Sequence, residues 1–171
     1  MDFRIPFGVR GHKYTEEEIA TTVAVMHGEA PLTQGACLHE FESRFRRYAG
    51  VEHAFAVSSA TAALEIAAQL CQFETDDEVI IPAHTYTSSA YPFVKAGATP
   101  VWADIDPDTR VVTPETISAC ISSRTRAVVV PHLYGYGVDM TPIMALAEER
   151  QIIVIEDAAQ AVGVRIDGRM A

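Results

Sequence analysis

The sequence has few lysines and cysteines and no long apolar segment, and each shortage excludes a class of protein. No apolar run approaches the ~20 residues that span a bilayer, so we expect no membrane association. The three cysteines are widely spaced and odd in number, which indicates neither a zinc site nor a disulfide framework. We therefore expect a cytoplasmic protein. The glycine-rich loops that hold dinucleotides and nucleoside triphosphates are also missing, which argues against a binding site for either of these ligands.

Acidic residues dominate the charge of the chain. Its 171 residues carry a net charge of −10 at neutral pH, and such a surface repels the phosphodiester backbone. The densest basic group, Arg44, Arg46 and Arg47, lies beside Glu40 and Glu42, a pattern typical of a solvated helix face. Nucleic acid is therefore not an expected partner.

Short apolar runs alternate with helical segments after residue 53. The strand-like runs are 54–57, 78–81, 100–103, 127–130 and 152–155, and the helical segments between them are 61–71, 88–96, 114–121 and 142–150. Two of these helices begin with Thr-Pro, which predicts threonine N-caps at Thr113 and Thr141. Two further helices come first, one opened by a capping box at Thr15 and one closed by Gly50. This order predicts an α/β fold with a mainly parallel sheet and helices on both faces.

Asp157 stands directly after the last of these strands. An acid at the carboxyl end of a buried parallel strand lies at the edge where open α/β sheets bind ligands. No His-x-His or Asp-x-Asp-x-Asp pattern adjoins it, so metal ligation is the weaker interpretation. A charge-assisted hydrogen bond to a protonated ring nitrogen, as in pyridoxal 5′-phosphate (PLP), is the stronger one. Gln160 is close enough to contact the same ligand, whereas Glu156 points to the opposite face and is interpreted as structural.

A second candidate feature lies where the predicted strand 54–57 meets an alanine-rich helix. Ser58, Ser59 and Thr61 place hydroxyl groups at the first helical turn, whose unpaired N–H groups and dipole favour an anion such as phosphate. An ordinary N-cap serine explains the same residues equally well. This segment alone does not decide between the two interpretations.

Tyr86 lies among hydroxyl residues directly after the predicted strand 78–81. Its ring can lie flat on a planar ligand, but an aromatic residue at a helix start is the more ordinary interpretation of this position alone. The nearby His84 has no metal-ligand partner at helical spacing.

Together these segments resemble the DegT/StrS family of sugar-nucleotide aminotransferases, which use PLP and have the aspartate-aminotransferase fold. The resemblance extends over nearly the whole chain, and its motifs are specific in their order and spacing. They are Pro-Leu-Thr-Gln-Gly at 31–35, Phe-Glu at 41–42, Ser-Ala-Thr-Ala-Ala-Leu at 59–64, Gly-Ala-Thr-Pro-Val at 97–101, Asp-Ile-Asp at 104–106, His-Leu-Tyr-Gly at 132–135 and Glu-Asp-Ala-Ala-Gln at 156–160.

The resemblance implies a set of cofactor-binding residues. Ala60 and Thr61, preceded by Ser59, match the positions that hold the cofactor phosphate, although the family commonly has glycine in place of Ala60. Tyr86 matches the aromatic residue that stacks on the pyridine ring. Asp157 matches the carboxylate on the ring nitrogen.

The resemblance also implies how the rest of the chain is used. Gln160 matches a residue beside the ring oxygen or the substrate, and Thr33 and Gly35 match a loop near the substrate opening. Residues 1–36 are then an N-terminal helix with this substrate-side loop, and residues 37–171 are part of the PLP-binding large domain. A homodimer with active sites shared across its interface is implied as well.

The chain departs from the family at the catalytic lysine. Family members carry a Schiff-base lysine shortly after the Asp-x-x-Gln segment and then a small C-terminal domain, and this sequence has neither. Its two lysines, Lys13 and Lys95, match no catalytic position of the family. We therefore interpret the chain as the N-terminal part of a larger enzyme or a truncated gene product, inactive alone.

Three functions are compatible with these observations. The first is a PLP-dependent aminotransferase that transfers an amino group from glutamate or glutamine to a keto sugar, which is expected to be linked to a nucleotide. The second is a sugar dehydratase of the same family that uses pyridoxamine 5′-phosphate (PMP) and has histidine in place of the lysine. The third is a catalytically inactive fragment that binds the cofactor or a partner.

Overall fold

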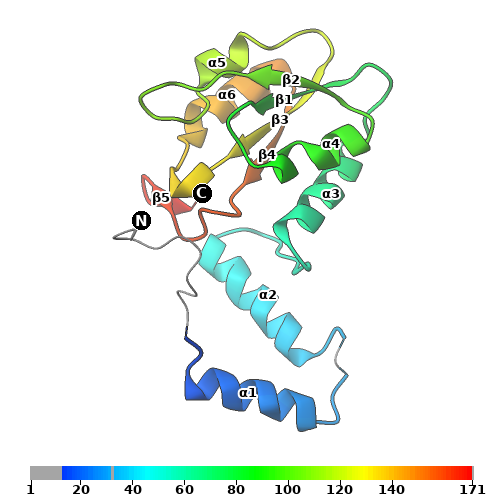
Figure 1. Cartoon of the computed structure of the whole chain (residues 1–171), viewed down its shortest axis with the longest axis vertical. Helices are drawn as coiled ribbons and strands as arrows, with labels where there is room; N and C mark the ends of the chain where they lie inside the picture. The colour runs from blue at the N-terminus through cyan, green and yellow to red at the C-terminus, as the bar shows by residue number, and fades with distance from the viewer. Residues whose placement is uncertain (1–12, 32, 171) are drawn as a thin grey trace, which may run out of the picture. The chain divides into compact units, whose positions relative to one another are not determined.

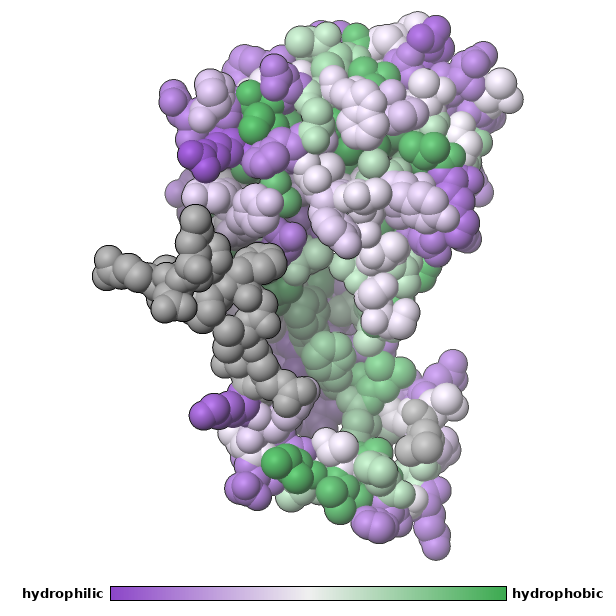
Figure 2. All heavy atoms as spheres, viewed as in Figure 1, coloured by the Kyte–Doolittle hydropathy of each residue, from purple (hydrophilic) through white to green (hydrophobic). Residues whose placement is uncertain are grey.

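The first part of the chain is a pair of helices. The computed structural model describes residues 13–31 and 33–170, and the chain divides into two compact units, Met1–Ala54 and Phe55–Ala171. No helix among the described residues is long and apolar enough to cross a membrane. The first unit contains α1 (Glu16–His27) and α2 (Ala36–Ala49). Neither helix has a buried residue, and apolar residues show on the surface of α1 in Figure 2.

The predicted ends of these two helices are confirmed. Thr15 Oγ1 accepts a hydrogen bond from the Glu18 N–H at 3.2 Å, and the Glu18 carboxylate accepts one from the Thr15 N–H at 2.6 Å, which is a capping box. Helix α2 ends at Gly50, whose φ of 73° lies in the left-handed region that suits glycine.

A four-stranded parallel sheet forms the centre of the second unit, in the order β2-β1-β3-β4 (Figure 1). The strands are β1 (Glu78–Pro82), β2 (Thr99–Ala103), β3 (Thr125–Pro131) and β4 (Ile153–Asp157). Four of the five predicted strands are therefore confirmed. The central strands β1 and β3 are almost wholly buried, which explains their continuous apolar sequences.

Helices cover both faces of this sheet, as predicted. They are α3 (Ala60–Leu70), the 3-10 turn η1 (Thr87–Ser89), α4 (Tyr91–Lys95), α5 (Pro114–Ser118), the 3-10 turn η2 (Leu133–Gly135) and α6 (Met140–Arg150). A hairpin of β5 (Arg165–Ile166) and β6 (Arg169–Met170) follows β4. Successive strand residues point to opposite faces. Ile80 packs in one core with Ile143 of α6, whereas Val79 and Ile81 pack in the other with Phe93 of α4.

The prediction of a strand at 54–57 is wrong. These residues belong to no strand, and the Phe55 side chain is 80% exposed. An apolar run is not enough for a strand, because the backbone also needs a neighbouring strand to pair with. In the described part of the chain the sheet ends at β2 and β4.

Two predicted helix starts also differ from the structure, while Thr113 caps α5 as predicted. Helix α6 is capped by Asp139, which accepts from the Thr141 N–H at 3.0 Å, so Thr141 is not the N-cap. The segment 88–96 is broken at Ala90 into η1 and α4. The break is explained by Pro92, which has no N–H to donate to a carbonyl four residues earlier.

Candidate functional site

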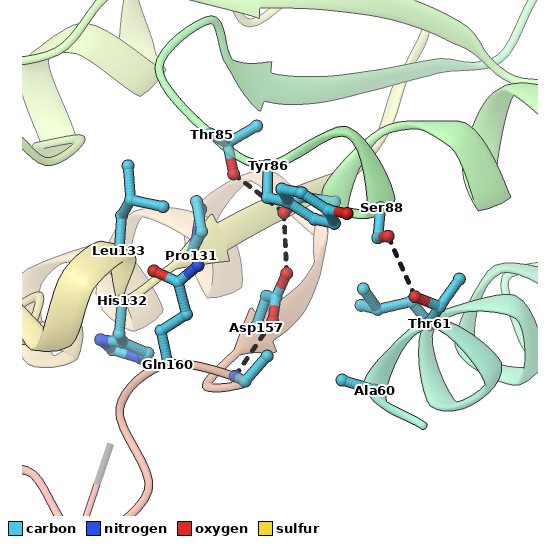
Figure 3. A pocket seen from close by; sticks show the side chains of 13 residues that line it. Ala60, Thr61, Thr85, Tyr86, Ser88, Pro131, His132, Leu133, Asp157 and Gln160 are labelled. Carbon is cyan, nitrogen blue, oxygen red and sulfur yellow. Dashed lines mark hydrogen bonds between the residues drawn. The ribbon is translucent and has the colours of Figure 1, made fainter. Parts of the chain in front are cut away.

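A cavity of about 210 Å³ lies at the carboxyl ends of β1, β3 and β4 (Figure 3). Ligands of open α/β sheets bind at this edge. The lining comes from the start of α3, from the last residues of β3 and β4 and from the segments that follow the three strands: Ala60, Thr61, Leu64, Thr85, Tyr86, Ser88, Ser89, Pro131, His132, Leu133, Asp157, Ala159 and Gln160. Every one of these residues belongs to the second unit.

Asp157, the last residue of β4, presents its carboxylate to this cavity. Oδ2 accepts a hydrogen bond from Ser89 Oγ at 2.7 Å, and Oδ1 accepts one from the Ala159 N–H at 3.1 Å. Ser89 is 1% exposed and receives a hydrogen bond in turn from Thr85 Oγ1 at 2.8 Å. The carboxylate is therefore held at both oxygens. Its neighbour Glu156 does not line this cavity, in agreement with its predicted position on the opposite face.

The start of α3 forms the opposite side of the cavity in the view of Figure 3. Ala60 and Thr61 line it, and Thr61 Oγ1 donates to Ser88 Oγ at 2.9 Å. Ser59 does not line it: its hydroxyl accepts from the Ala62 N–H at 3.1 Å and caps the helix. The ordinary N-cap interpretation thus describes Ser59, while the unpaired N–H groups of the first turn of α3 are left to face an anion.

Tyr86 lies between these two sides in Figure 3. It precedes η1, lines the cavity and is 65% exposed. A large exposed aromatic ring beside a cavity offers a flat apolar face to a planar ligand. The structure thus brings Thr61, Tyr86 and Asp157 to one cavity, although 96 positions separate Thr61 from Asp157 in the sequence (157 minus 61).

The amide of Gln160 is oriented by a neighbouring turn. Its Oε1 accepts from the Tyr134 N–H at 2.8 Å, so the amide nitrogen is the group left to donate toward the cavity. Tyr134 has a φ of 54° and Gly135 a φ of 81°, two successive left-handed residues that aim this N–H at Gln160. Nothing in the sequence around Tyr134 announces this contact.

Sequence reasoning missed four polar residues of the cavity: Thr85, Ser88, Ser89 and His132. The signal for the first three was the run of hydroxyl residues around Tyr86, but the partners of Ser88 and Ser89 lie in α3 and β4. The imidazole of His132 is fully buried and accepts the Val138 N–H at Nδ1, 3.0 Å away.

Thr33 and Gly35 lie in the first unit, in the loop between α1 and α2. Gly35 is the N-cap of α2, and a Cβ at this position would lie 2.6 Å from the Pro31 carbonyl oxygen, so the loop requires glycine. Their contact with a substrate stays a prediction.

The family comparison agrees with this geometry. The chain matches the DegT/DnrJ/EryC1/StrS aminotransferase family over residues 12–171. It belongs to this family. The GDP-perosamine synthase of Caulobacter vibrioides is 42% identical over 135 residues, which are 79% of this chain and 36% of that protein.

Solved aminotransferase structures share the fold of this DegT-family chain. An aminotransferase from Psychrobacter cryohalolentis is 35% identical with a TM-score of 0.88, and the match covers 97% of this chain and 42% of that one. A candidate sugar aminotransferase from Streptococcus pneumoniae, solved in PLP and PMP forms, is 28% identical in the match to its PLP form and 29% in the match to its PMP form. Its PLP form has a TM-score of 0.86 and is matched over 93% of this chain and 44% of its own. The chain thus spans well under half the length of each of these relatives.

The residues of the cavity fit the family's cofactor, PLP. A carboxylate suits a protonated ring nitrogen, a helix start with unpaired N–H groups suits a phosphate, and an aromatic residue between them suits a ring. Among the described residues, no group of three or more histidine, cysteine or acidic side chains is placed to hold a metal ion. Asp106, in an Asp-x-Asp-x-Asp sequence, serves a turn instead, and hydrogen bonds from the Thr109 N–H and hydroxyl lower its pKa.

Lys95 is not placed to act as the lysine of a DegT-family enzyme. It does not line the cavity, and its Nζ lies 2.9 Å from Glu65 Oε1 on the surface. This hydrogen bond raises the pKa of Lys95, which disfavours the neutral amine that a nucleophile requires.

Proposed function

We propose that this chain forms the cofactor-binding part of a PLP-dependent sugar aminotransferase. The observation that carries the proposal is the shared cavity of Thr61, Tyr86 and Asp157. The N–H groups of the first helical turn of α3 bind the phosphate, and the Thr61 hydroxyl, which donates to Ser88, holds this turn in place. Tyr86 covers one face of the ring and excludes water from it, and Asp157 keeps a proton on the ring nitrogen.

The remaining cavity residues orient these groups. Ser89 and the Ala159 N–H hold the Asp157 carboxylate, and the Gln160 amide nitrogen donates toward the oxygen-bearing edge of the ring. PLP, when bound, withdraws electrons from the carbon that gains or loses the amino group. A lysine to move the proton at that carbon is not among the residues that line the cavity, and we propose that residues 13–170 do not supply it.

The amino donor and acceptor are proposed by analogy with the relatives. We infer glutamate or glutamine as donor and a nucleotide-linked keto sugar as acceptor, because a GDP-perosamine synthase is among the similar proteins. We also infer a cytoplasmic homodimer. In the protein extended by any coding sequence that follows Ala171, release of 2-oxoglutarate from glutamate tests the donor, and sedimentation equilibrium tests the dimer.

Binding of PMP to the 171-residue chain, measured by equilibrium dialysis, tests the proposed cofactor site. We expect saturable binding that Asp157→Asn weakens about tenfold, because the charge on the acceptor of the ring N–H is lost. Asp104→Asn makes the same change of charge on an exposed loop outside the cavity and should leave the affinity unchanged. Absence of binding, or equal affinity of the Asp157→Asn variant and the unmodified chain, would contradict the proposal.

A further inference from the structure

Two consecutive serines of η1 hold opposite sides of the cavity. Ser88 Oγ accepts from Thr61 Oγ1 at 2.9 Å, and Ser89 Oγ donates to Asp157 Oδ2 at 2.7 Å. One partner stands at the start of α3 and the other at the end of β4. The side chains of η1 are thus hydrogen-bonded to both sides of the cavity, the start of α3 and the end of β4.

The geometry of a 3-10 turn accounts for this division. Such a turn has three residues per revolution, so neighbouring side chains point roughly 120° apart. Two adjacent hydroxyls therefore reach different partners. The turn is closed by the Ser89 N–H, which donates to the Tyr86 carbonyl at 2.9 Å, so the aromatic residue of the cavity is fixed in the same turn.

The hydrogen bonds on the Asp157 side run in one direction. Thr85 Oγ1 donates to Ser89 Oγ, and Ser89 Oγ donates its single proton to the carboxylate, which can only accept. Ser89 is buried, so water does not replace either bond. The carboxylate position thus depends on a turn that follows β1, two strands away from β4 in the sheet.

We propose that Ser88 and Ser89 are positioning residues that set the spacing between the phosphate-binding and ring-nitrogen-binding sides of the cofactor site. The proposal rests on the proposed function and assigns separate tasks to the two serines. Ser88 fixes Thr61 and with it the first turn of α3, whose N–H groups bind the phosphate, and Ser89 fixes Asp157 for the ring nitrogen. Neither serine needs to touch the cofactor for this role.

The test compares three ligands by equilibrium dialysis with the 171-residue chain. They are PMP, its 1-deaza analogue, which has a C–H in place of the ring nitrogen, and pyridoxamine, which has no phosphate. The affinity of PMP relative to the deaza analogue is the nitrogen preference, and its affinity relative to pyridoxamine is the phosphate preference.

We expect Ser89→Ala to lower the nitrogen preference about tenfold and to leave the phosphate preference unchanged, since it removes a charge-assisted hydrogen bond. Ser88→Ala should lower the phosphate preference about fivefold, as for a neutral hydrogen bond, and leave the nitrogen preference unchanged. Ser89→Thr and Ser88→Thr keep the hydroxyl and should restore each preference. Thr87→Ala changes the exposed residue of the same turn, which does not line the cavity, and should alter neither.

Other outcomes overturn the inference. If both alanine variants lower both preferences equally, η1 is only a structural element. If neither preference changes, the two hydrogen bonds do not position the site. Should Ser89→Ala fail to fold, Thr85→Val removes the preceding donor of the same series and must lower the nitrogen preference alone.

Failure of the proposed cofactor binding would give a result different from failure of the positioning role. If the unmodified chain shows no PMP binding, or no preference for nitrogen or phosphate, the cofactor proposal itself falls. If it shows both preferences and the serine variants keep them, only the positioning role falls.

Discussion

The buried imidazole of His132 donates a hydrogen bond from Nε2 to Glu156 Oε2, 3.0 Å away on the neighbouring strand β4. The direction follows from the other ring nitrogen, since Nδ1 accepts the Val138 N–H and the proton must then lie on Nε2. His132 directly follows β3, and Glu156 lies within the paired strand β4, in register with Val130. His132, which lines the cavity, is thereby tied to the strand that ends in Asp157.

Removing the acceptor of this pair should destabilise the second unit. Glu156→Ala leaves a buried N–H without a partner, and we expect it to lower the free energy of unfolding by about 1–3 kcal/mol. Glu156→Gln keeps a side-chain oxygen and should lose less. Urea denaturation followed by circular dichroism measures both, and Glu149→Ala, a change at an exposed residue of α6, is the control. Equal stability of Glu156→Ala and the unmodified chain would contradict this pairing.

Glu78 should make the fold sensitive to acid. It is buried at the start of β1, and hydrogen bonds from Ser122 and then Arg124 lower its pKa below the ordinary value. Because the folded-state pKa is the lower one, the ionised carboxylate stabilises the fold above the pKa of the unfolded chain. This contribution is lost as the pH falls through the folded-state pKa.

Unfolding free energies measured between pH 6 and pH 3 test this statement. The unmodified chain should lose stability over this interval more steeply than Glu78→Gln, which has no group to titrate. Parallel curves for the two proteins would show that Glu78 makes no such contribution.

Ser59 should stabilise the fold as the N-cap of α3. Ser59→Ala removes the acceptor for the Ala62 N–H and should lower the free energy of unfolding by about 1 kcal/mol. Ser59→Asp keeps a cap but adds a negative charge beside the helix start that binds the anion. We expect Ser59→Asp to keep the urea midpoint of the unmodified chain and to bind PMP less well. If Ser59→Ala instead loses more free energy of PMP binding than free energy of unfolding, Ser59 contacts the cofactor.

Tyr86 should matter for binding and little for folding. Its ring is 65% exposed, so Tyr86→Ala should change the urea midpoint little but weaken PMP binding up to about tenfold through loss of ring contact. Tyr86→Phe keeps the ring and should bind normally. Tyr91→Ala, at an exposed aromatic residue of α4 outside the cavity, serves as the control for dialysis. Normal PMP affinity in Tyr86→Ala would show that the Tyr86 ring does not stack on the cofactor.

Local chemistry made much of the fold predictable. The strands β1 to β4 and the capping box at Thr15 depend on residues close in sequence, and the structure confirms them. The strand expected at 54–57 failed because pairing is a property of two segments. The cap expected at Thr141 failed because Asp139, two residues earlier, is the stronger N-cap.

The candidate site was predictable in part for the same reason. Asp157 at a strand end and Thr61 at a helix start are positions that neighbouring residues define. The roles of Ser59, Ser88 and Ser89 are not, because three chemically identical hydroxyls differ only in what lies opposite them. One caps α3, one binds Thr61 and one binds Asp157.

The sequence by itself determined the alternation of strands and helices and the acid that closes β4, because apolar periodicity and capping act over a few residues. Only the tertiary structure decided that a turn after β1 reaches both the start of α3 and the end of β4. The physical reason is the strand order β2-β1-β3-β4, which places β3 between β1 and β4 and is set by packing on both faces of the sheet.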